Sequence, residues 1–198
     1  MRYSSEHKAE TRSRIVSLAA QQIRLKGPAQ VAVTEVMASA GLTHGGFYAH
    51  FPSKDALVAE AVEAMFADAQ SRTPALDDAL ADETTDVLGA FRTYLASYLS
   101  PAHRDGPERG CPLPALSTDM ARTPGAAKTA FIQGFDKLRS RIEEVLSRIG
   151  TDDPRGEASA VLAQMVGAVG LARAVGNGPG SDAILQDTLT SLSTRLGL

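Results

Sequence analysis

Residues 34–57 constrain the fold of this chain more than any other segment, because they predict two short helices around a tight turn, followed by a third helix. An apolar stripe at helical spacing marks the first helix: Val33, Val36, Met37 and Ala40. Gly41 follows directly and is expected to end it. Phe47 and Phe51 stand four residues apart, so both side chains are expected to point inward. The segment therefore predicts a helix-turn-helix.

The opposite face of the second predicted helix is polar or bare, and it carries Thr43, His44, Gly45 and Tyr48. Thr43 is also well placed to cap this helix. Each glycine inside a helix costs about 1 kcal/mol relative to alanine, and Gly45 and Gly46 are adjacent. A simple loop between two core helices would also tolerate glycine. The polar neighbours favour instead a backbone that approaches phosphates and base edges, as the second helix of a helix-turn-helix does in the major groove.

The third predicted helix begins with a charge in an unfavourable place. Pro52 stops the helix before it, and Ser53 is a candidate N-cap. Lys54 then falls in the first turn, where the helix dipole disfavours a cation. A phosphate partner would explain a cation at this position.

These motifs resemble the DNA-binding domain of the TetR family of bacterial transcriptional regulators (TetR/AcrR type), over about residues 10–60. The family's first-helix arginine, core positions and terminal glycine are matched by Arg14, Ile15, Ala19, Ala20, Ile23 and Gly27. Its tyrosine, histidine, phenylalanine and lysine pattern is matched by Tyr48, His50, Phe51, Ser53, Lys54 and Leu57. The resemblance implies an all-α fold, in which an N-terminal three-helix helix-turn-helix domain (residues 1–52) precedes a C-terminal helical bundle (residues 53–198) that senses a ligand and dimerises.

The same resemblance implies two sets of DNA contacts. Bases are approached by Thr43, His44 and Gly45, with Gly46 beside them, and the phosphate backbone is held by Tyr48, His50 and Lys54. Three positions depart from the family pattern. Ala32 stands where a capping hydroxyl residue is frequent, His44 where lysine or arginine is common, and Gly46 where threonine or alanine is common. The operator sequence therefore does not transfer from the family.

Charge is divided along the chain in a way that suits a DNA-binding end. Residues 1–54 hold seven Lys or Arg against three Asp or Glu, whereas the rest holds 13 against 20. A basic end can supply the salt-sensitive contacts to phosphates, and an acidic body discourages indiscriminate DNA binding. Random variation between the two parts would give the same numbers, so the division supports the DNA interpretation without requiring it.

The remaining composition predicts a cytoplasmic protein that neither enters nor crosses a membrane. The 43% hydrophobic content can bury a core, no run of about 18 apolar residues occurs, and the N-terminus lacks the apolar stretch of a signal peptide. A single cysteine excludes an internal disulfide framework.

The body is predicted to be helical throughout. We expect helices over about residues 54–70, 75–100, 112–122, 124–149, 153–175 and 181–196. The stretch 101–112 is rich in proline, glycine and charge, and it predicts a mobile surface loop.

The last two predicted helices have the composition of an association surface. Valines and leucines between 161 and 175 lie among small residues such as Gly167 and Gly170, which permit close helix approach. The final helix adds a leucine stripe through Leu185, Leu189 and Leu192. Together they predict half of an intermolecular four-helix bundle in a homodimer, as a palindromic operator requires. Completing the core of a monomer is the alternative.

Amphipathic and apolar side chains on the middle helices are candidates for a small-molecule inducer pocket: Tyr94, Tyr98, Met120, Phe131, Phe135, Leu138 and Met165. Core packing would explain each of them equally well. The TetR resemblance implies an inducer cavity among these helices, and the inducer itself is not identified by the sequence.

Cys111 is a separate candidate for sensing, because it stands between Gly110 and Pro112 at a predicted helix start. With Arg109 adjacent and Arg104 nearby, a depressed thiol pKa is expected, which is the chemistry of an electrophile or oxidant sensor. Some TetR-type repressors that respond to electrophiles carry a Gly-Cys pair at a similar place. A buried cysteine acting as a small hydrophobe is the alternative.

No enzymatic, cofactor or metal site is expected. The four histidines are scattered, and the sequence has neither a phosphate-binding glycine loop nor a nucleophile elbow. The sequence therefore predicts a DNA-binding transcriptional regulator, a repressor by family analogy, that is released by a small-molecule inducer or by thiol modification. A helical ligand-binding or protein-interaction module without specific DNA binding is the alternative, favoured by Ala32 and the double glycine.

Overall fold

Helices form the described part of the chain, residues 2–82 and 84–198 of a computed structural model, and no strand occurs there. In chain order they are α1 Arg2–Lys26, α2 Val33–Ser39, the 3₁₀ helix η1 His44–Ala49, α3 Lys54–Ser71, α4 Pro74–Ala81, α5 Val87–Tyr98, α6 Pro101–Asp105, the 3₁₀ helix η2 Pro107–Arg109, α7 Pro112–Met120, α8 Ala126–Arg148, α9 Pro154–Val175 and α10 Pro179–Leu196. The all-α prediction is confirmed.

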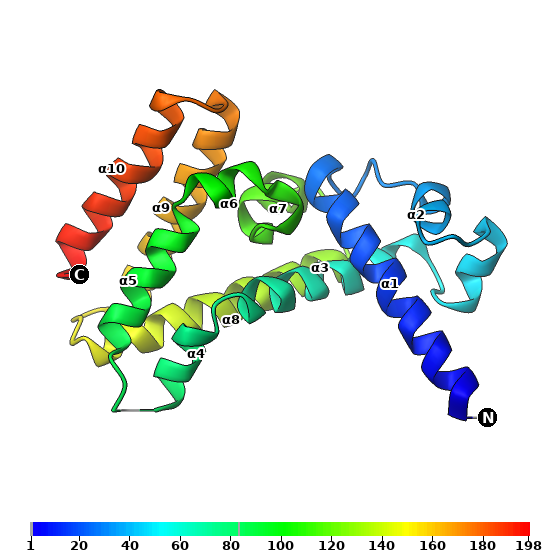
Figure 1. Cartoon of the computed structure of the whole chain (residues 1–198), viewed down its shortest axis with the longest axis horizontal. Helices are drawn as coiled ribbons and strands as arrows, with labels where there is room; N and C mark the ends of the chain where they lie inside the picture. The colour runs from blue at the N-terminus through cyan, green and yellow to red at the C-terminus, as the bar shows by residue number, and fades with distance from the viewer. Residues whose placement is uncertain (1, 83) are drawn as a thin grey trace.

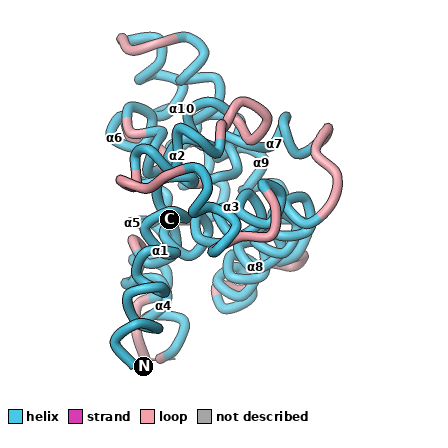
Figure 2. Tube along the Cα trace, turned by 90° about the vertical axis from the view of Figure 1, so that its right-hand side faces the viewer, coloured by secondary structure: helices cyan, strands magenta, loops and turns pink. Residues whose placement is uncertain are grey.

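The helices spread between two ends of an elongated molecule. α1 and α2 gather at one end, α9 and α10 lie side by side at the other, and α3 and α8 run between them (Figure 1). Turned by 90°, the described chain is seen to be mostly helical, with loops between the helices (Figure 2). Proline favours the first position of a helix, and it marks where six of these helices begin: α4, α6, η2, α7, α9 and α10.

Two hydrophobic clusters organise the helices. The first packs one face of α1, with Ile15, Ala19 and Ile23 fully buried, against α2, η1 and α3. It continues into α7 and the start of α8, so the apolar core does not stop at residue 52, where the sequence predicted a domain boundary. The second cluster joins α5, α8, α9 and α10. α3 and α8 pack along each other and connect the two ends.

The expected single helix over residues 75–100 is wrong, because two aspartates interrupt it. α4 ends at Ala81, and the Asp82 side chain accepts hydrogen bonds from the backbone N–H and the hydroxyl of Thr84 (2.9 and 2.8 Å). Asp86 then caps a new helix, accepting from the backbone N–H of Gly89 at 2.9 Å. Local side-chain hydrogen bonds thus replace helical ones in this stretch.

The expected mobile loop over residues 101–112 is also wrong. The stretch folds into α6 and η2, and it buries Arg104 and Cys111, which are 6% and 7% exposed. Ser100 caps α6 by accepting from the His103 backbone N–H. Residues 101–111 lie between the two hydrophobic clusters and are called the bridge segment below.

Candidate DNA-binding element and ligand cavity

The helix-turn-helix is anchored from inside by apolar side chains. Val36 and Met37 of α2 are fully buried, and Gly41 turns the chain with a φ of +70°, a conformation that favours glycine. Phe47 and Phe51 are each 1% exposed, with stacked rings 5.6 Å apart. The predicted inward orientation of the two phenylalanines is therefore confirmed, and it fixes which side of η1 faces outward.

The outward side carries the residues expected to approach DNA. Thr43, His44, Gly45 and Tyr48 are exposed, Tyr48 to 68%. The His44 and Tyr48 rings meet edge to face at 6.4 Å, so they form one continuous polar and aromatic surface. The structure thus brings these four predicted positions together on one face.

The second helix is a 3₁₀ helix rather than an α-helix, and Thr43 caps it without its side chain. Thr43 occupies the N-cap position, but its hydroxyl makes no capping bond, and the turn is closed by the Gly46 N–H donating to the Thr43 carbonyl at 3.1 Å. Side-chain capping by Thr43 was therefore wrong. The Thr43 hydroxyl is left exposed on the outward face.

Neither glycine of the pair is required by packing. A Cβ on Gly45 would meet nothing within 4 Å, and one on Gly46 would make ordinary contacts with Met37 at 3.7 Å and Thr43 at 3.8 Å. Both have negative φ, which any residue can adopt. Because neither fold nor backbone demands glycine here, close approach by an outside partner is the remaining physical reason for it.

The residues expected to hold phosphates surround the end of η1. Ser53 caps α3 as predicted, accepting from the Ala56 N–H at 3.1 Å. Lys54 is half-buried, and its ammonium donates to the Ala29 carbonyl at 3.1 Å. A lysine ammonium has three donors, so two are left for a phosphate. The Nδ1 atom of His50 is buried without a hydrogen-bond partner.

Arg12 holds this element in place, and the sequence analysis missed it. Its guanidinium donates to the His50 carbonyl at the end of η1, pairs with Glu60 of α3 (Nε to Oε1 3.1 Å), and lies 4.2 Å from the centre of the Phe51 ring. Arg12 and Glu60 are 48 residues apart, so no local pattern could have paired them. Arg12 therefore ties α1, η1 and α3 together.

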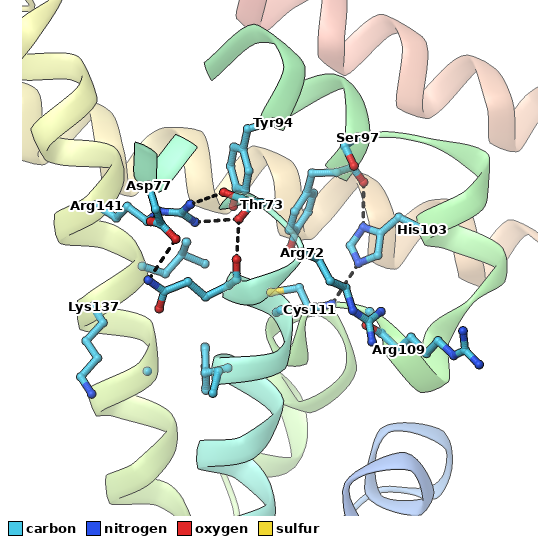
Figure 3. A pocket seen from close by; sticks show the side chains of 18 of the residues that line it. Arg72, Thr73, Asp77, Tyr94, Ser97, His103, Arg109, Cys111, Lys137 and Arg141 are labelled. Atoms are coloured by element: carbon cyan, nitrogen blue, oxygen red, sulfur yellow. Dashed lines mark hydrogen bonds and ion pairs between the residues drawn. The ribbon is translucent and has the colours of Figure 1, made fainter. Parts of the chain in front are cut away.

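A cavity of about 940 Å³ lies between α3, α5, α8 and the bridge segment (Figure 3). Four of the predicted ligand candidates line it: Tyr94, Tyr98, Cys111 and Leu138. The other four do not. Met120 is buried in the first cluster, Met165 is buried in the second, and Phe131 and Phe135 pack against these cores.

Cys111, Tyr98 and His103 form a largely buried part of the cavity wall in which none of the three side chains is charged. Burial raises the pKa of the Cys111 thiol and of the Tyr98 hydroxyl, so the expected depression of the thiol pKa is wrong. His103 donates from Nδ1 to the Tyr98 carbonyl (2.7 Å) and accepts from the Cys111 N–H at Nε2 (3.0 Å), which fixes its neutral tautomer. Burial, the largest cause, lowers the His103 pKa.

Arginines from three helices hold the bridge segment by its backbone. Arg173 of α9 donates to the carbonyls of His103 (2.8 Å) and Arg104 (3.1 Å). Arg24 of α1, in the DNA-binding part of the molecule, donates to the Glu108 carbonyl at 3.3 Å, and Arg72, at the C-terminal end of α3, donates to the Arg109 carbonyl at 2.8 Å. The cavity wall is thereby connected to both ends of the molecule.

Close packing leaves no room for a side chain at Gly110. An added Cβ would lie 2.8 Å from the His103 Nε2 atom and 2.9 Å from an Arg173 nitrogen. Arg104 anchors the other end of the bridge segment to α10, donating to the Ser181 hydroxyl at 2.8 Å. Arg104 therefore points to α10, where Asp182 is its carboxylate partner, and it also pairs with its neighbour Asp105 on α6.

α9 presents a second apolar face to the outside. Its length and composition alone would allow it to cross a membrane, with a mean hydropathy of 1.5 over a window that is 39% buried. One face packs on α8 and α10. The exposed residues include Ala160, Ala163, Gly167, Leu171, Ala174 and Val175, with Leu171 60% exposed. Added Cβ atoms on Gly167 and Gly170 would meet nothing within 4 Å. This face is small, apolar and accessible to another helix.

The described residues contain no group of three or more His, Cys, Asp or Glu side chains that could hold a metal ion. Nothing in the cavity wall pairs a nucleophile with a general base, because His103 uses both ring nitrogens on backbone groups. What the arrangement offers is a DNA-sized outward face at one end and a ligand-sized cavity in the body. The fold and these two features define a helical DNA-binding regulator.

The comparison with known families agrees with that class. Residues 15–61 match the model of bacterial regulatory proteins of the tetR family. This match identifies the N-terminal part as a domain of the TetR type, and DNA-binding regulation is the function that the match supports. No curated protein matches the chain.

Solved structures share the fold over the whole length. A TetR transcriptional regulator from Chloroflexus aurantiacus is 24% identical, with a TM-score of 0.81 over 97% of this chain and 96% of that one. A TetR family regulator from Agrobacterium tumefaciens is 20% identical, with a TM-score of 0.79 over 95% and 98%. Reduced NemR from E. coli is 19% identical, with a TM-score of 0.78 over 93% and 97%. At these identities the likeness establishes the fold.

Proposed function

We propose that this chain is a homodimeric, cytoplasmic transcriptional repressor that binds a palindromic operator and is released by a small molecule in the cavity of its body. The observation that carries the proposal is the outward face of the helix-turn-helix. Exposed Thr43, His44 and Tyr48 surround glycines that packing does not require. Phe47, Phe51 and Arg12 hold this face rigidly from behind, as a base-contacting element needs.

The assigned DNA contacts follow from this placement. Thr43, His44, Gly45 and Gly46 approach base edges, where the exposed imidazole donates to a guanine or accepts from an adenine amino group according to its tautomer. Tyr48, His50 and Lys54 contact phosphates at the border of the same face.

A dimer gives the operator its two-fold symmetry. The exposed face of α9 suits a second copy of the chain, because Gly167 and Gly170 allow the closest helix approach and Leu171 and Val175 supply the buried apolar area. Two such faces with their α10 neighbours would form a four-helix bundle. The two DNA-binding ends are then spaced by the rigid body between them.

Release requires that the inducer favours one spacing of the two ends over the other. The bridge segment offers the physical connection, since its carbonyls accept from Arg24 of α1, which packs in the DNA-binding part, from Arg72 at the C-terminal end of α3, and from Arg173 of α9. A ligand that displaces the cavity wall at Cys111 would strain these bonds. The loss of operator affinity would be limited by how much more tightly the ligand binds the released spacing of the two ends than the DNA-bound spacing.

Modification of Cys111 is the second candidate signal, favoured by its place in the cavity wall. A bulky adduct on this buried thiol would push on the bridge segment directly. Its raised pKa makes it a slow nucleophile at neutral pH. Treatment with an electrophile distinguishes the two signals: release of the operator from the Cys111→Ser protein would exclude the thiol.

The proposal is tested by selecting fragments of the source genome with purified protein, then footprinting the tightest fragment across a salt series. We expect a protected palindrome with affinity that falls steeply with salt. Lys54→Ala should reduce affinity for all sequences and flatten the salt slope by about one unit, whereas Lys128→Ala, an exposed lysine of α8, should leave the slope unchanged.

Weak, sequence-independent binding in the same experiment would refute operator recognition and favour a helical ligand-binding or protein-interaction module. A slope that Lys54→Ala leaves unchanged would remove Lys54 from the phosphate contacts. A mass equal to one chain in the presence of operator would refute the dimer.

A further inference from the structure

The cavity wall contains two tyrosine hydroxyls without a partner that suits them. Tyr94 and Tyr98 stand one turn apart on α5, with ring centres 6.2 Å apart, and each is 7% exposed. The Tyr98 hydroxyl is buried without an oxygen or nitrogen partner, and among the described residues no hydrogen bond is made by the Tyr94 hydroxyl, which lines the same cavity. Tyr98 faces only the Cys111 thiol, a weak partner. A buried hydroxyl is nearly always hydrogen-bonded, so that of Tyr98 is available to a ligand, and that of Tyr94 lines the cavity beside it.

Both hydroxyls are donors at any physiological pH. Burial raises the pKa of Tyr94 and of Tyr98 above the ordinary value of a phenol, and no nearby charge reverses this. Neither group therefore cancels positive charge around the cavity. Neutral His103 and the protonated Cys111 add none.

Positive charge exceeds negative charge around the same cavity. Arg72, Arg109, Lys137 and Arg141 line it, against Glu63 and Asp77 (Figure 3). Asp77 is already paired with Arg141 at 2.6 Å. Lys137 and Arg109 form no ion pair among the described residues, and both are exposed at the rim.

Two further arginines add to this field from behind the wall. Arg173 donates only to backbone carbonyls, so no carboxylate neutralises it directly. Arg24 and Arg72 share a single carboxylate, Asp68. Opposite them, Phe66, Leu138 and Ala130 supply an apolar side to the cavity.

We propose that the cavity takes an anionic ligand with an aromatic or apolar body, such as an arene carboxylate or sulfonate, whose oxyanion accepts hydrogen bonds from Tyr94 and Tyr98. The surrounding guanidinium groups attract the charge, and the body lies against Phe66 and Leu138. Hydrogen bonds to an ionised acceptor are about twice as strong as neutral ones, which suits two donors that have no protein acceptor. The inference rests on the proposed function only in assigning this cavity as the ligand site.

The test uses two fluorescent probes that share one aromatic skeleton. Anilinonaphthalene sulfonate carries an anionic group, and N-phenylnaphthylamine lacks it. We expect the full-length protein to bind the sulfonate at least ten times more tightly. Equal binding, or tighter binding of the neutral probe, would overturn the proposal.

Two sets of variants locate the effect. The Tyr94→Phe/Tyr98→Phe double variant removes only unpartnered hydroxyls, so the fold is expected to persist, and sulfonate affinity should fall about tenfold while the neutral probe binds as before. Arg109→Gln should weaken the sulfonate several-fold at low salt, whereas Arg122→Gln, an exposed arginine outside the cavity, should not. Unchanged sulfonate affinity in the double variant, or equal effects of the two arginine variants, would overturn the proposal.

Operator binding measured on the same preparations separates this inference from the proposed function. Specific DNA binding with no probe preference would reject the ligand class alone. Probe preference without specific DNA binding would reject the repressor and keep the ligand class.

Discussion

Replacing Arg12 with methionine is expected to weaken operator binding by up to about thirtyfold without changing its salt dependence. Arg12 contacts the back of the helix-turn-helix, on the His50 carbonyl, the Glu60 carboxylate and the Phe51 ring. Methionine keeps an apolar side chain of similar length and loses all three polar contacts. The variant therefore loosens the DNA-binding element while its outward face keeps the same residues.

The magnitude follows from the three contacts. The side chains of Arg12 and Glu60 are 38% and 34% exposed, so solvent screening limits their pairing to about 0.5–1 kcal/mol. The guanidinium on the Phe51 ring contributes about 0.5–1 kcal/mol, and the hydrogen bond to the His50 carbonyl about 1 kcal/mol. Because the Arg12 side chain is 38% exposed, the low end of each range applies, and the total is about 2 kcal/mol. Since about 1.4 kcal/mol corresponds to a factor of ten, affinity falls by up to about thirtyfold.

The assay is fluorescence anisotropy with a labelled operator over a series of salt concentrations. Arg12→Met should lower the association constant at every concentration and leave the slope against salt unchanged, unlike Lys54→Ala. Glu60→Gln tests whether charge or the positioning of Arg12 governs operator affinity, because the two would change the affinity in opposite directions. It removes a negative charge near DNA, which by charge alone would tighten binding, whereas loss of its bond to Arg12 should weaken it.

Either of two results would refute this reasoning. A slope that falls by about one unit in Arg12→Met would mean that Arg12 contacts a phosphate. Tighter binding by Glu60→Gln would mean that charge, and not positioning, governs this part of the element.

Three further predictions concern other parts of the molecule. Gly46→Ala should raise the stability of the isolated protein slightly, because its Cβ fits at 3.7 Å from Met37 and alanine favours helices, yet it should weaken operator binding. Thermal unfolding measures the stability and fluorescence anisotropy measures the DNA affinity. Unchanged DNA affinity would mean that close approach of the backbone to DNA is not needed at this position. Leu171→Glu should convert the dimer into a monomer by light scattering, whereas Leu25→Glu, 58% exposed on α1, should not; a dimeric Leu171→Glu protein would place the interface elsewhere. Alkylation of Cys111 by iodoacetamide should be slower in the folded than in the unfolded protein at pH 8. The rate in the folded protein should rise as the pH increases above about 9, because burial raises the thiol pKa above its ordinary range. Equal rates in the folded and unfolded protein would contradict the burial of the thiol.

The helix-turn-helix was predictable from the sequence because its determinants are local. Gly41 adopts the left-handed turn, Phe47 and Phe51 share a face, and Ser53 caps α3, all within a single stretch of chain. Arg12 was not predictable in the same way, since its partners are 38 to 48 residues away.

The bridge segment shows why the candidate site was only partly predictable. Its prolines, glycines and charges resemble those of a loop, and its order depends on arginines at positions 24, 72 and 173, far from it in sequence. The prediction for the Cys111 pKa was wrong for the same reason, since it considered only residues near Cys111 in sequence. Its sequence neighbour Arg104 points to α10, and burial by other helices dominates the thiol pKa.

The bridge segment is held mainly through its main-chain carbonyls, which has a consequence for how such a chain can diversify. A carbonyl is the same at every position, so side chains such as those of Glu108 and Arg109 can be exchanged while Arg24, Arg72 and Arg173 keep their bonds. Within the segment, Gly110 is constrained because it has no space for a Cβ, and His103 and Arg104 are constrained by the hydrogen bonds of their side chains. The chemistry of the cavity can therefore drift toward new compounds while the mechanical link to the DNA-binding end is inherited unchanged.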